Sequence, residues 1–328
     1  MGVCKRVVIL VPEGPSILSS IVGTHHVFTQ ASDLVEKQCG SAVFSVQLVG
    51  LSEEVKLENG LYSVHPDIHV AECAGADLII IPALHDSIET LERNEEFIPW
   101  IREQYQQGAE LASLCTGAFL LAASGLLNGR RCTTHWASAD KFRRMFPAVE
   151  LVAETIITDE RGIYSSGGAY SFLRLILYLI EKYCGRDVAI TCSKVFEIDL
   201  DRSCQSPFII FIGEKEHEDE EIKQAQVFME TNVGDKISVD RLAGMVALSR
   251  RNFERRFKKA TTHTPVEYLQ RVKMEAAKKG LEAGRATVSD VMYAVGYSDS
   301  KAFRSIFKKI TGLSPMEYRN KYNREIAV

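Results

Sequence analysis

The last third of the chain contains one sequence pattern twice, at a spacing of fifty residues. Eight positions of the first copy recur in the second copy with the same residue type. These positions are Phe253, Phe257, Lys258, Lys259, Thr261, Pro265, Glu267 and Tyr268, and their counterparts are Phe303, Phe307, Lys308, Lys309, Thr311, Pro315, Glu317 and Tyr318. A fixed period of this kind indicates one supersecondary unit used twice. Because the apolar positions follow helical spacing, we expect each copy to be a small helical module.

Capping residues predict three helices in and after the first copy. Ser238 can cap a helix over 239–247, and Ser249 can cap a second helix over 250–260. A longer helix over 265–281 then leads to the second copy, and a proline suits its first turn. We expect this connecting helix to hold the two modules at a fixed separation, since recognition helices in successive major grooves lie about 34 Å apart.

The second helix of each module, over 250–260 and 299–310, has an apolar side and a basic side. Residues two positions apart on a helix point in nearly opposite directions, so the cations lie opposite the repeated phenylalanines. Guanidinium and ammonium groups on such a side can reach guanine edges and phosphates. The residues predicted to bind DNA are Arg250, Arg251, Asn252, Arg255, Lys258, Ser300, Lys301, Arg304 and Lys308. The alternative is an ordinary helical bundle whose basic side is only solvated.

The charge of the chain is also unevenly distributed between the part that contains the repeat and the rest. Residues 222–328 carry 21 Lys and Arg against 11 Asp and Glu, whereas the other 221 residues carry 18 against 32. A basic part joined to an acidic body suggests a regulatory part attached to a part that binds a polyanion. The duplication and the positive balance together favour DNA binding over the solvated bundle.

The second copy also resembles a known signature. The run Val295–Asp299 reads VGYSD, and the run Phe303–Arg319 reads F-x3-FKK-x2-G-x-SP-x2-YR. Both resemble the signature of the AraC/XylS family of transcriptional regulators, over about the last hundred residues. The resemblance implies a tandem helix-turn-helix domain that binds double-stranded promoter DNA, commonly as an activator. Because Arg255 corresponds to Ser305 in the second copy, we expect the first copy to carry most of the base discrimination.

Before residue 200, short apolar runs alternate with helix-like stretches. The runs are Arg6–Val11, Ala42–Leu51, Asp77–Pro82 and Leu111–Leu114, and a strand pair follows at Ile156–Thr158 and Ile163–Ser165. The helix-like stretches are Ser20–Gln38, Asn94–Gln107, Gly117–Leu127, Tyr170–Tyr183 and Val188–Ile198. Apolar strands separated by helices predict an α/β domain with a parallel sheet and helices on both faces.

A cysteine lies where one predicted strand passes into a helix. Cys115 directly follows the strand 111–114, so we expect it at the carboxyl edge of the sheet, where open α/β sheets bind ligands. The dipole of the next helix favours its thiolate, and His135, twenty residues on, can supply a base. Three interpretations of Cys115 stay open: a small residue suited to a tight turn, a residue that lines a ligand pocket, and a nucleophile.

The same stretch resembles the DJ-1/PfpI superfamily. The matching runs are CTGAF at 115–119, GLLNGRR at 125–131 and TTHW at 133–136, and the similarity extends from about residue 5 to 200. It is closest to the branch fused to AraC-type domains, and it implies a flavodoxin-like, class I glutamine amidotransferase-like fold. In that superfamily an elbow cysteine, a histidine and an acidic residue can form a hydrolytic site. Cys115 and His135 match the first two.

The acidic member of such a site is missing from its usual place. Ser20 stands near the position where the fused branch usually carries Asp, and Glu13 lies earlier in the same loop. We therefore predict a ligand-sensing domain and not an enzyme. The alternatives are a cysteine hydrolase or amidase with an appended DNA-binding domain, and a redox sensor that acts through oxidation of Cys115.

The predicted ligand pocket comprises Cys115, Thr116, Gly117, His135, Glu13, Ser166 and Gly167. Ser166 and Gly167 precede an apolar helix, so their backbone amides can meet an anionic group of a ligand. The family resemblance suggests a small amine or an amino-acid-like metabolite as the effector.

These features predict three parts: a ligand-sensing domain over 1–200, an arm and acidic linker over 201–220, and a DNA-binding domain over 221–328. The acidic residues 214–221 are interpreted as a solvated stretch without a specific role. A homodimer and a contact with RNA polymerase are expected. The eight cysteines form no C-x-x-C pair, so no metal site, cofactor site or disulfide framework is predicted, and we expect a reducing cytoplasmic location away from the membrane.

Overall fold

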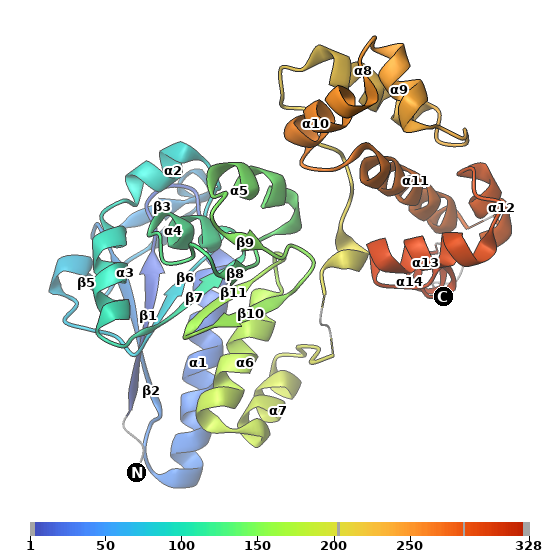
Figure 1. Ribbon diagram of the computed structural model, residues 1–328. Coiled ribbons are helices and arrows are strands. Elements are labelled where there is room, and N and C mark those ends of the chain that lie inside the picture. The colour runs from blue at the N-terminus through green and yellow to red at the C-terminus, as the bar shows by residue number, and fades with distance from the viewer. Residues whose placement is uncertain (1–3, 202–203, 285, 324–328) are drawn as a thin grey trace. The chain divides into compact units, whose positions relative to one another are not determined.

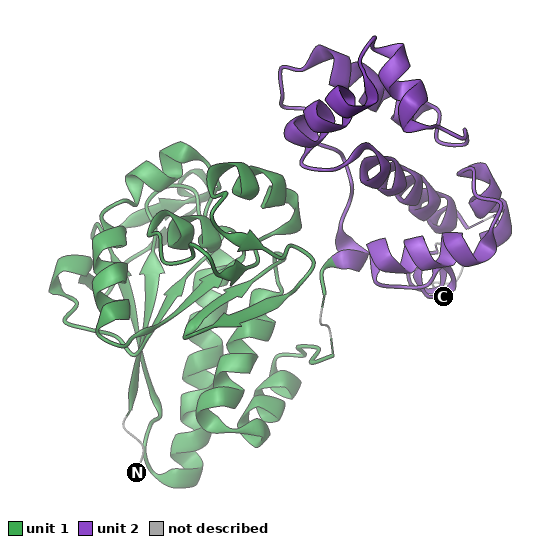
Figure 2. Ribbon diagram, viewed as in Figure 1, with its two compact units in different colours: residues 1–205 green, residues 206–328 purple. Residues whose placement is uncertain are grey.

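A computed structural model describes residues 4–201, 204–284 and 286–323 of the chain. The chain forms two compact units, Met1–Gln205 and Ser206–Val328 (Figure 2). Residues 202–203 of the predicted linker lie outside the described residues. Within the described ranges, no helix is both long and apolar enough to cross a membrane.

The first unit is built on a seven-stranded sheet in the order β10-β11-β7-β6-β1-β2-β5 (Figure 1). Its strands are β1 (Lys5–Val11), β2 (Phe44–Gly50), β5 (Ile68–His69), β6 (Leu78–Ile81), β7 (Glu110–Leu114), β10 (Ile157–Glu160) and β11 (Ile163–Ser166). Neighbouring strands run parallel, except that β10 is antiparallel to β11. The predicted α/β fold with a parallel sheet is confirmed.

Helices cover both faces of this sheet (Figure 1). On one face α1 (Leu18–Cys39), α6 (Phe172–Cys184) and α7 (Arg186–Val195) pack against alternate residues of β1, among them Val7 and Ile9. On the other face α3 (Phe97–Gln106), α4 (Ala118–Ala123) and α5 (Ala139–Met145) pack against Val8 and Leu10. Because successive side chains of a strand point to opposite faces, the uninterrupted apolar run fills two cores.

Two predicted helices of this unit differ from the structure. The helix expected over 94–107 is instead α2 (Ile88–Arg93) followed by α3, because the side chain of Asn94 donates hydrogen bonds to the carbonyl oxygens of Glu13 and Thr90 and closes α2. The helix expected over 117–127 is the shorter α4, since the chain turns at Gly125, whose φ is +78°. The sequence did not predict the small pairs β3 (Val55–Leu57) with β4 (Tyr62–Val64) and β8 (Arg131–Cys132) with β9 (Glu150–Leu151).

The second unit is helical. It contains α8 (Glu220–Thr231), α9 (Val239–Met245), α10 (Arg250–Thr261), α11 (Pro265–Glu282), α12 (Val288–Ala294), α13 (Ser300–Thr311) and α14 (Pro315–Tyr322). The pairs α9–α10 and α12–α13 are the two modules, and α11 connects them (Figure 1). The predicted caps of α9 and α10 are confirmed, since Ser238 accepts a hydrogen bond from the amide of Arg241 and Ser249 from that of Asn252. The sequence did not predict α14.

The repeat in the sequence is also a repeat in packing. In the first module Phe257 lies between Phe253 and Tyr268, with ring centroids 5.5 and 5.3 Å away. The equivalent rings of the second module, fifty residues later, are 5.8 and 5.5 Å apart. Each module therefore has its own aromatic core, as the duplicated positions predict.

Candidate DNA-binding faces and ligand cavity

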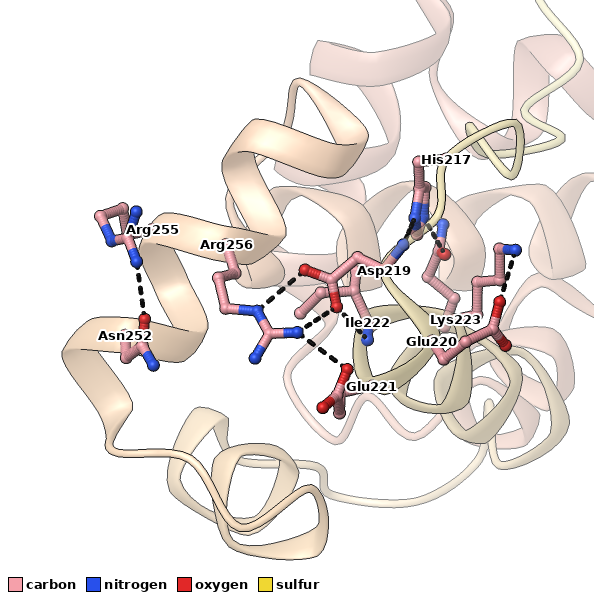
Figure 3. Close-up of polar contacts among 10 residues, drawn as sticks. His217, Asp219, Glu220, Glu221, Ile222, Lys223, Asn252, Arg255 and Arg256 are labelled. Atoms are coloured by element: carbon pink, nitrogen blue, oxygen red, sulfur yellow. Dashed lines mark hydrogen bonds and ion pairs between the residues drawn. The ribbon is translucent and has the colours of Figure 1, made fainter.

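The basic side of α10 faces solvent in the second unit. Arg251, Arg255 and Lys258 are exposed, whereas Phe253 and Phe257 on the opposite side are fully buried. The guanidinium of Arg255 donates a 2.9 Å hydrogen bond to the side-chain oxygen of Asn252 (Figure 3). That bond holds Arg255 along the helix surface and leaves its remaining donors available for a ligand.

Arg250 is engaged in two ion pairs at the start of α10. Its guanidinium lies 3.1 Å from a carboxylate oxygen of Asp240 and 3.2 Å from one of Glu254. All three side chains are largely exposed, with 44 to 67% of each accessible. Exposed pairs of this kind contribute little and are screened by salt, so the predicted role of Arg250 at DNA remains compatible with them.

The predicted DNA-binding residues of the second module lie on the exposed side of α13. Ser300, Lys301, Arg304 and Lys308 are all exposed. The helix begins one residue later than predicted, because the side chain of Asp299 caps it by accepting hydrogen bonds from the amides of Lys301 and Ala302, at 2.8 and 3.2 Å. An aspartate at this end of a helix is favoured by the helix dipole.

One arginine of α10 is used inside the unit, which the sequence did not predict. Arg256 donates to both carboxylate oxygens of Asp219, at 2.9 and 2.6 Å, and to Glu221 at 2.8 Å (Figure 3). The hydrogen bond from Arg256 lowers the pKa of Asp219, with a smaller contribution from the amide of Ile222, which Asp219 caps. The interpretation of residues 214–221 as a merely solvated stretch is therefore wrong, because two of its acids bind the second helix of the first module.

The segment that leads to α8 is also bound to this unit. The carbonyl oxygen of Ile209 accepts a 2.6 Å hydrogen bond from Lys278, and the amide of Phe211 donates to Glu275 at 3.1 Å. Farther on, the side chain of Gln226 donates to the carbonyl oxygen of Glu214 at 2.7 Å. The predicted linker thus forms part of the helical unit from the first residues after Gln205.

The first unit contains a cavity of about 830 Å³ at the carboxyl ends of β1, β6 and β7. Cys115, Thr116 and His135 line it, as predicted for the ligand pocket. Its wall also carries charged side chains of both signs and much of the loop after β1. These are Lys56, Glu58, Asp86 and Arg93, with residues 14–17. A cavity of this size with a few polar groups is typical of a small-molecule site.

Cys115 sits on the sharp turn between β7 and α4, in the short helix Cys115–Gly117. Its φ is +54°, a conformation that non-glycine residues rarely adopt, and only 6% of the residue is exposed. Burial raises the pKa of its thiol to about 11, and the charge of Asp86 acts in the same direction. Hydrogen bonds from the amide and hydroxyl of Thr116 favour the thiolate, as expected at the start of a helix, but desolvation outweighs them, so the thiol is not activated.

His135 and Asp86 complete the polar side of the cavity. The ring nitrogen Nδ1 of His135 accepts a 3.1 Å hydrogen bond from the amide of Ala137, and burial lowers the pKa of the imidazole. Burial opposes the ionisation of Asp86, but hydrogen bonds from Ser138 and Lys141 outweigh it and lower the pKa of that carboxyl. The cavity therefore holds a neutral imidazole near an ionised carboxylate that already has a cationic partner.

The sequence missed Asp86 and misplaced four pocket residues. Among the described residues, the cavity lining does not include Gly117, Glu13, Ser166 or Gly167. Glu13 accepts a 2.6 Å hydrogen bond from Ser52, and a side chain at Gly117 would meet the carbonyl oxygen of Ile81 at 2.4 Å. Ser166 is fully buried in β11.

Gly167 packs against the end of the first unit. A side chain there would lie 1.9 Å from the amide nitrogen of Gln205, which donates hydrogen bonds to the carbonyl oxygens of Thr134 and Ala153 at 3.0 and 2.8 Å. Gly167 lies next to the loop that carries His135, and the absence of a side chain leaves room for that of Gln205. Its amide donates a 2.8 Å hydrogen bond to the carbonyl oxygen of Ile156, so the expected amide site for an anion is not formed at this position.

Comparisons with known proteins agree with the two units. Residues 5–182 match the model of the DJ-1/PfpI family, and residues 242–321 match that of a helix-turn-helix domain. The HTH-type transcriptional regulator GbdR of Pseudomonas aeruginosa is 26% identical over 270 residues, which cover 81% of this chain and 72% of GbdR. The isonitrile hydratase of Pseudomonas putida is 27% identical over 144 residues, which cover 44% of this chain and 59% of the hydratase.

A solved structure supports the fold of the first unit. It is a protein of Vibrio parahaemolyticus described as a transcriptional regulator, 26% identical, with a TM-score of 0.53 over 58% of this chain and 98% of that protein. The family match spans more than half of the chain, and the helix-turn-helix match covers both modules of the second unit. The chain therefore belongs to the DJ-1/PfpI family, in the branch that carries an AraC-type helix-turn-helix domain.

Proposed function

We propose that this protein is a transcription regulator that binds promoter DNA through its second unit and responds to a small molecule bound in its first unit. The observation that carries the proposal is the pair of solvent-facing basic helices, α10 and α13, each backed by an aromatic core. The first unit, up to Gln205, is assigned to sensing, and the second unit, which includes the arm before α8, to DNA binding. We infer a cytoplasmic homodimer that contacts RNA polymerase as an activator.

The two basic helices supply the groups that DNA recognition requires. Arg251 and Arg255 present guanidinium groups that can bind guanine edges with two hydrogen bonds. Lys258 and Lys308 end their helices with exposed ammonium groups suited to phosphates. Because α13 carries Lys301 where α10 carries Arg251, the first module is assigned most of the base discrimination.

The cavity of the first unit supports a bipolar effector. Arg93 and Lys56 can meet a carboxylate, and Glu58 can meet an ammonium group on the same wall. A small amine or amino-acid-like metabolite fits both the charges and the volume of about 830 Å³. A ligand of this kind regulates DNA binding only if it binds two arrangements of the protein with different affinities.

A hydrolase is the second candidate, since Cys115 and His135 line one cavity and the hydratase relative covers part of the first unit. Two features weigh against it. Burial holds the thiol of Cys115 protonated, and the carboxylate of Asp86 disfavours its ionisation further. Asp86 is itself bound to Lys141 at 3.1 Å. We therefore assign the cavity to binding and not to turnover.

The DNA-binding assignment can be tested with the full chain by selecting bound genomic fragments and measuring their affinity by fluorescence anisotropy. The wild-type protein is expected to enrich a defined sequence, and the double variant Arg251→Ala, Arg255→Ala is expected to lose that preference. A matched control is Arg186→Ala, Lys194→Ala, which removes the same charge from α7 of the first unit. Equal affinity for selected and unrelated duplexes in the wild-type protein would contradict the proposal.

The effector assignment can be tested by a thermal-shift screen of amino acids and amines on the full chain, because a ligand that binds only the folded state raises its apparent stability. A compound that binds in the cavity should no longer shift the variant Arg93→Ala. The control is Arg102→Ala, on α3, whose side chain binds the carbonyl oxygen of Ser124. An equal shift in Arg93→Ala would place the compound elsewhere.

A further inference from the structure

A buried lysine of the connecting helix joins the two helix-turn-helix modules. Lys273 lies in the middle of α11, and only 6% of it is exposed. Its ammonium group donates hydrogen bonds to the carbonyl oxygens of Val233 at 2.7 Å and Asp235 at 3.0 Å. A third hydrogen bond, of 2.8 Å, reaches the carbonyl oxygen of Val295.

These three carbonyls come from two segments that lie far apart in the sequence. Val233 and Asp235 belong to the loop between α8 and α9, which precedes the first module. Val295 belongs to the turn between α12 and α13, directly before the second basic helix. Lys273 therefore connects, through one side chain, the entrance of one module to the turn of the other.

The coordination satisfies the lysine completely. An ammonium group has three N–H donors and no acceptor, and here each donor has a carbonyl partner. Burying a charge without such partners is strongly unfavourable, and hydrogen bonds to a charged group are stronger than neutral ones. Separation of the modules would break the charge-assisted hydrogen bond to Val295 and exchange it for one to water, so this bond favours the closed arrangement.

The backbone of the loop before the first module also approaches the turn of the second module closely beside Lys273. A side chain at Gly296, whose φ is +75°, would lie 2.4 Å from the carbonyl oxygen of Gly234 and 2.8 Å from the lysine nitrogen. A side chain at Gly234 would lie 3.1 Å from the carbonyl oxygen of Ala294. The ring of Tyr297 completes this contact, with its centroid 5.8 Å from the ammonium. Only small residues at these positions permit the hydrogen bonds of the lysine.

We propose that Lys273 is a positioning residue for DNA binding, which fixes the two modules in one orientation so that α10 and α13 engage the duplex as a single unit. The assignment rests on the proposed DNA-binding function. A flexible connection would allow either basic helix to bind alone, with the second helix free to miss its groove. A fixed connection removes that conformational freedom before binding, which increases affinity.

The test is a double-mutant cycle on affinity for a mixed-sequence duplex about three helical turns long, which spans the 34 Å between successive grooves. One change is Lys273→Met, and the other is the pair Lys301→Ala, Lys308→Ala in the second module. In the wild-type background both modules bind together, so the pair of lysine substitutions weakens binding strongly. In the Lys273→Met background the second module contributes less to binding. We therefore expect the fold-loss of affinity caused by Lys301→Ala, Lys308→Ala to be at least about five times smaller there than in the wild-type background.

The control for charge is Lys279→Met, an exposed lysine on the same helix. It should lower affinity slightly and leave the effect of the Lys301→Ala, Lys308→Ala pair unchanged. Lys273→Arg, which keeps the charge, should restore part of the coupling. If Lys273→Met does not fold by circular dichroism, Gly296→Ala takes its place in the cycle, because its methyl group would separate the same backbone segments.

The outcomes distinguish this inference from the proposed function. An equal effect of the lysine pair in the wild-type and Lys273→Met backgrounds overturns the positioning role while DNA binding stands. A smaller effect in Lys273→Met and an unchanged one in Lys279→Met supports it. Loss of stability alone would not produce this pattern at a temperature where both variants are folded. A wild-type chain that binds neither this duplex nor any selected genomic fragment overturns the proposed function and this role with it.

Discussion

The reactivity of Cys115 decides between a binding site and a catalytic site in the first unit. Burial and the nearby carboxylate of Asp86 raise the pKa of this thiol from 9.0 to about 11. At neutral pH that rise lowers the fraction of thiolate about a hundredfold. A more basic thiolate is intrinsically more nucleophilic. With a Brønsted coefficient of about 0.4–0.5, the same rise in pKa makes each thiolate react roughly ten times faster. The net chemical effect is a reaction with a disulfide reagent about tenfold slower than that of an ordinary cysteine, before restricted access is considered.

The measurement is the modification rate of each cysteine peptide in the full chain, followed by mass spectrometry after brief exposure to a small disulfide reagent. Cys39 is an exposed cysteine of the same unit and serves as the internal reference. We expect Cys115 to react at least about tenfold more slowly than Cys39 at neutral pH, and its rate to keep rising up to about pH 11. The exposure of Cys115 is only 6%, which slows it further.

One result would refute this reasoning. If Cys115 reacts faster than Cys39 at pH 7 and its rate reaches a plateau well below pH 9, the thiol is activated and not suppressed. The cavity would then be a candidate for hydrolysis or for redox sensing, and Cys115→Ala would have to be assayed for loss of turnover. Replacement of Asp86 by Asn offers a second check, because removal of its charge should lower the pKa of Cys115 and raise the rate.

Three further predictions concern the second unit. Arg251→Ala and Arg255→Ala should each weaken binding to a selected promoter fragment by about 1–3 kcal/mol if the side chains contact bases, and unchanged anisotropy titrations for both would exclude this face. Replacement of Thr262, which ends α10 at a φ of +63°, by Gly should raise the free energy of unfolding by about 0.5–1 kcal/mol, because glycine adopts this conformation without strain. A lower melting temperature of this variant would contradict the prediction. Arg256 lowers the pKa of Asp219 below its ordinary value of 3.8. Their ion pair therefore contributes its full stability at pH values above 3.8, and this contribution is lost as the pH falls through the lowered pKa of the folded protein. The melting temperatures of wild-type and Asp219→Asn protein should therefore converge in acid, and a constant difference would disprove the linkage.

The regular parts of both units could be predicted because their signals are local and redundant. An apolar run as short and β-branched as Val7–Val11 favours a central strand over a buried helix, and the phenylalanines at 253 and 257 fix one side of a helix. Caps at Ser238 and Ser249 then set the helix starts closely. Short elements such as β3 and β4 escaped prediction because three residues hold too little pattern to exceed chance.

The cavity was predicted less well because its wall comes from loops far apart in the sequence. Cys115 and His135 carry a family resemblance, and each lines the cavity. Asp86 carries none, and only the sheet order β1-β6-β7 brings the loop after β6 beside Cys115. Gly167 looked like an amide site for an anion, but its missing side chain makes room for Gln205.

The composition of the second unit overstates the charge available to DNA. Arg256 is bound to two acids, Lys273 to three backbone carbonyls, and Lys278 to Glu275 and a carbonyl oxygen. These cations hold the arm and the two modules together. Because they are already paired inside the free protein, they do not neutralise DNA phosphates. Salt dependence of DNA binding counts only the phosphates that are newly neutralised. It should therefore reflect the exposed cations of α10 and α13 and not the whole basic excess. If affinity fell with salt concentration more steeply than the exposed cations of α10 and α13 can account for, the internal pairs would have to open when the protein binds DNA.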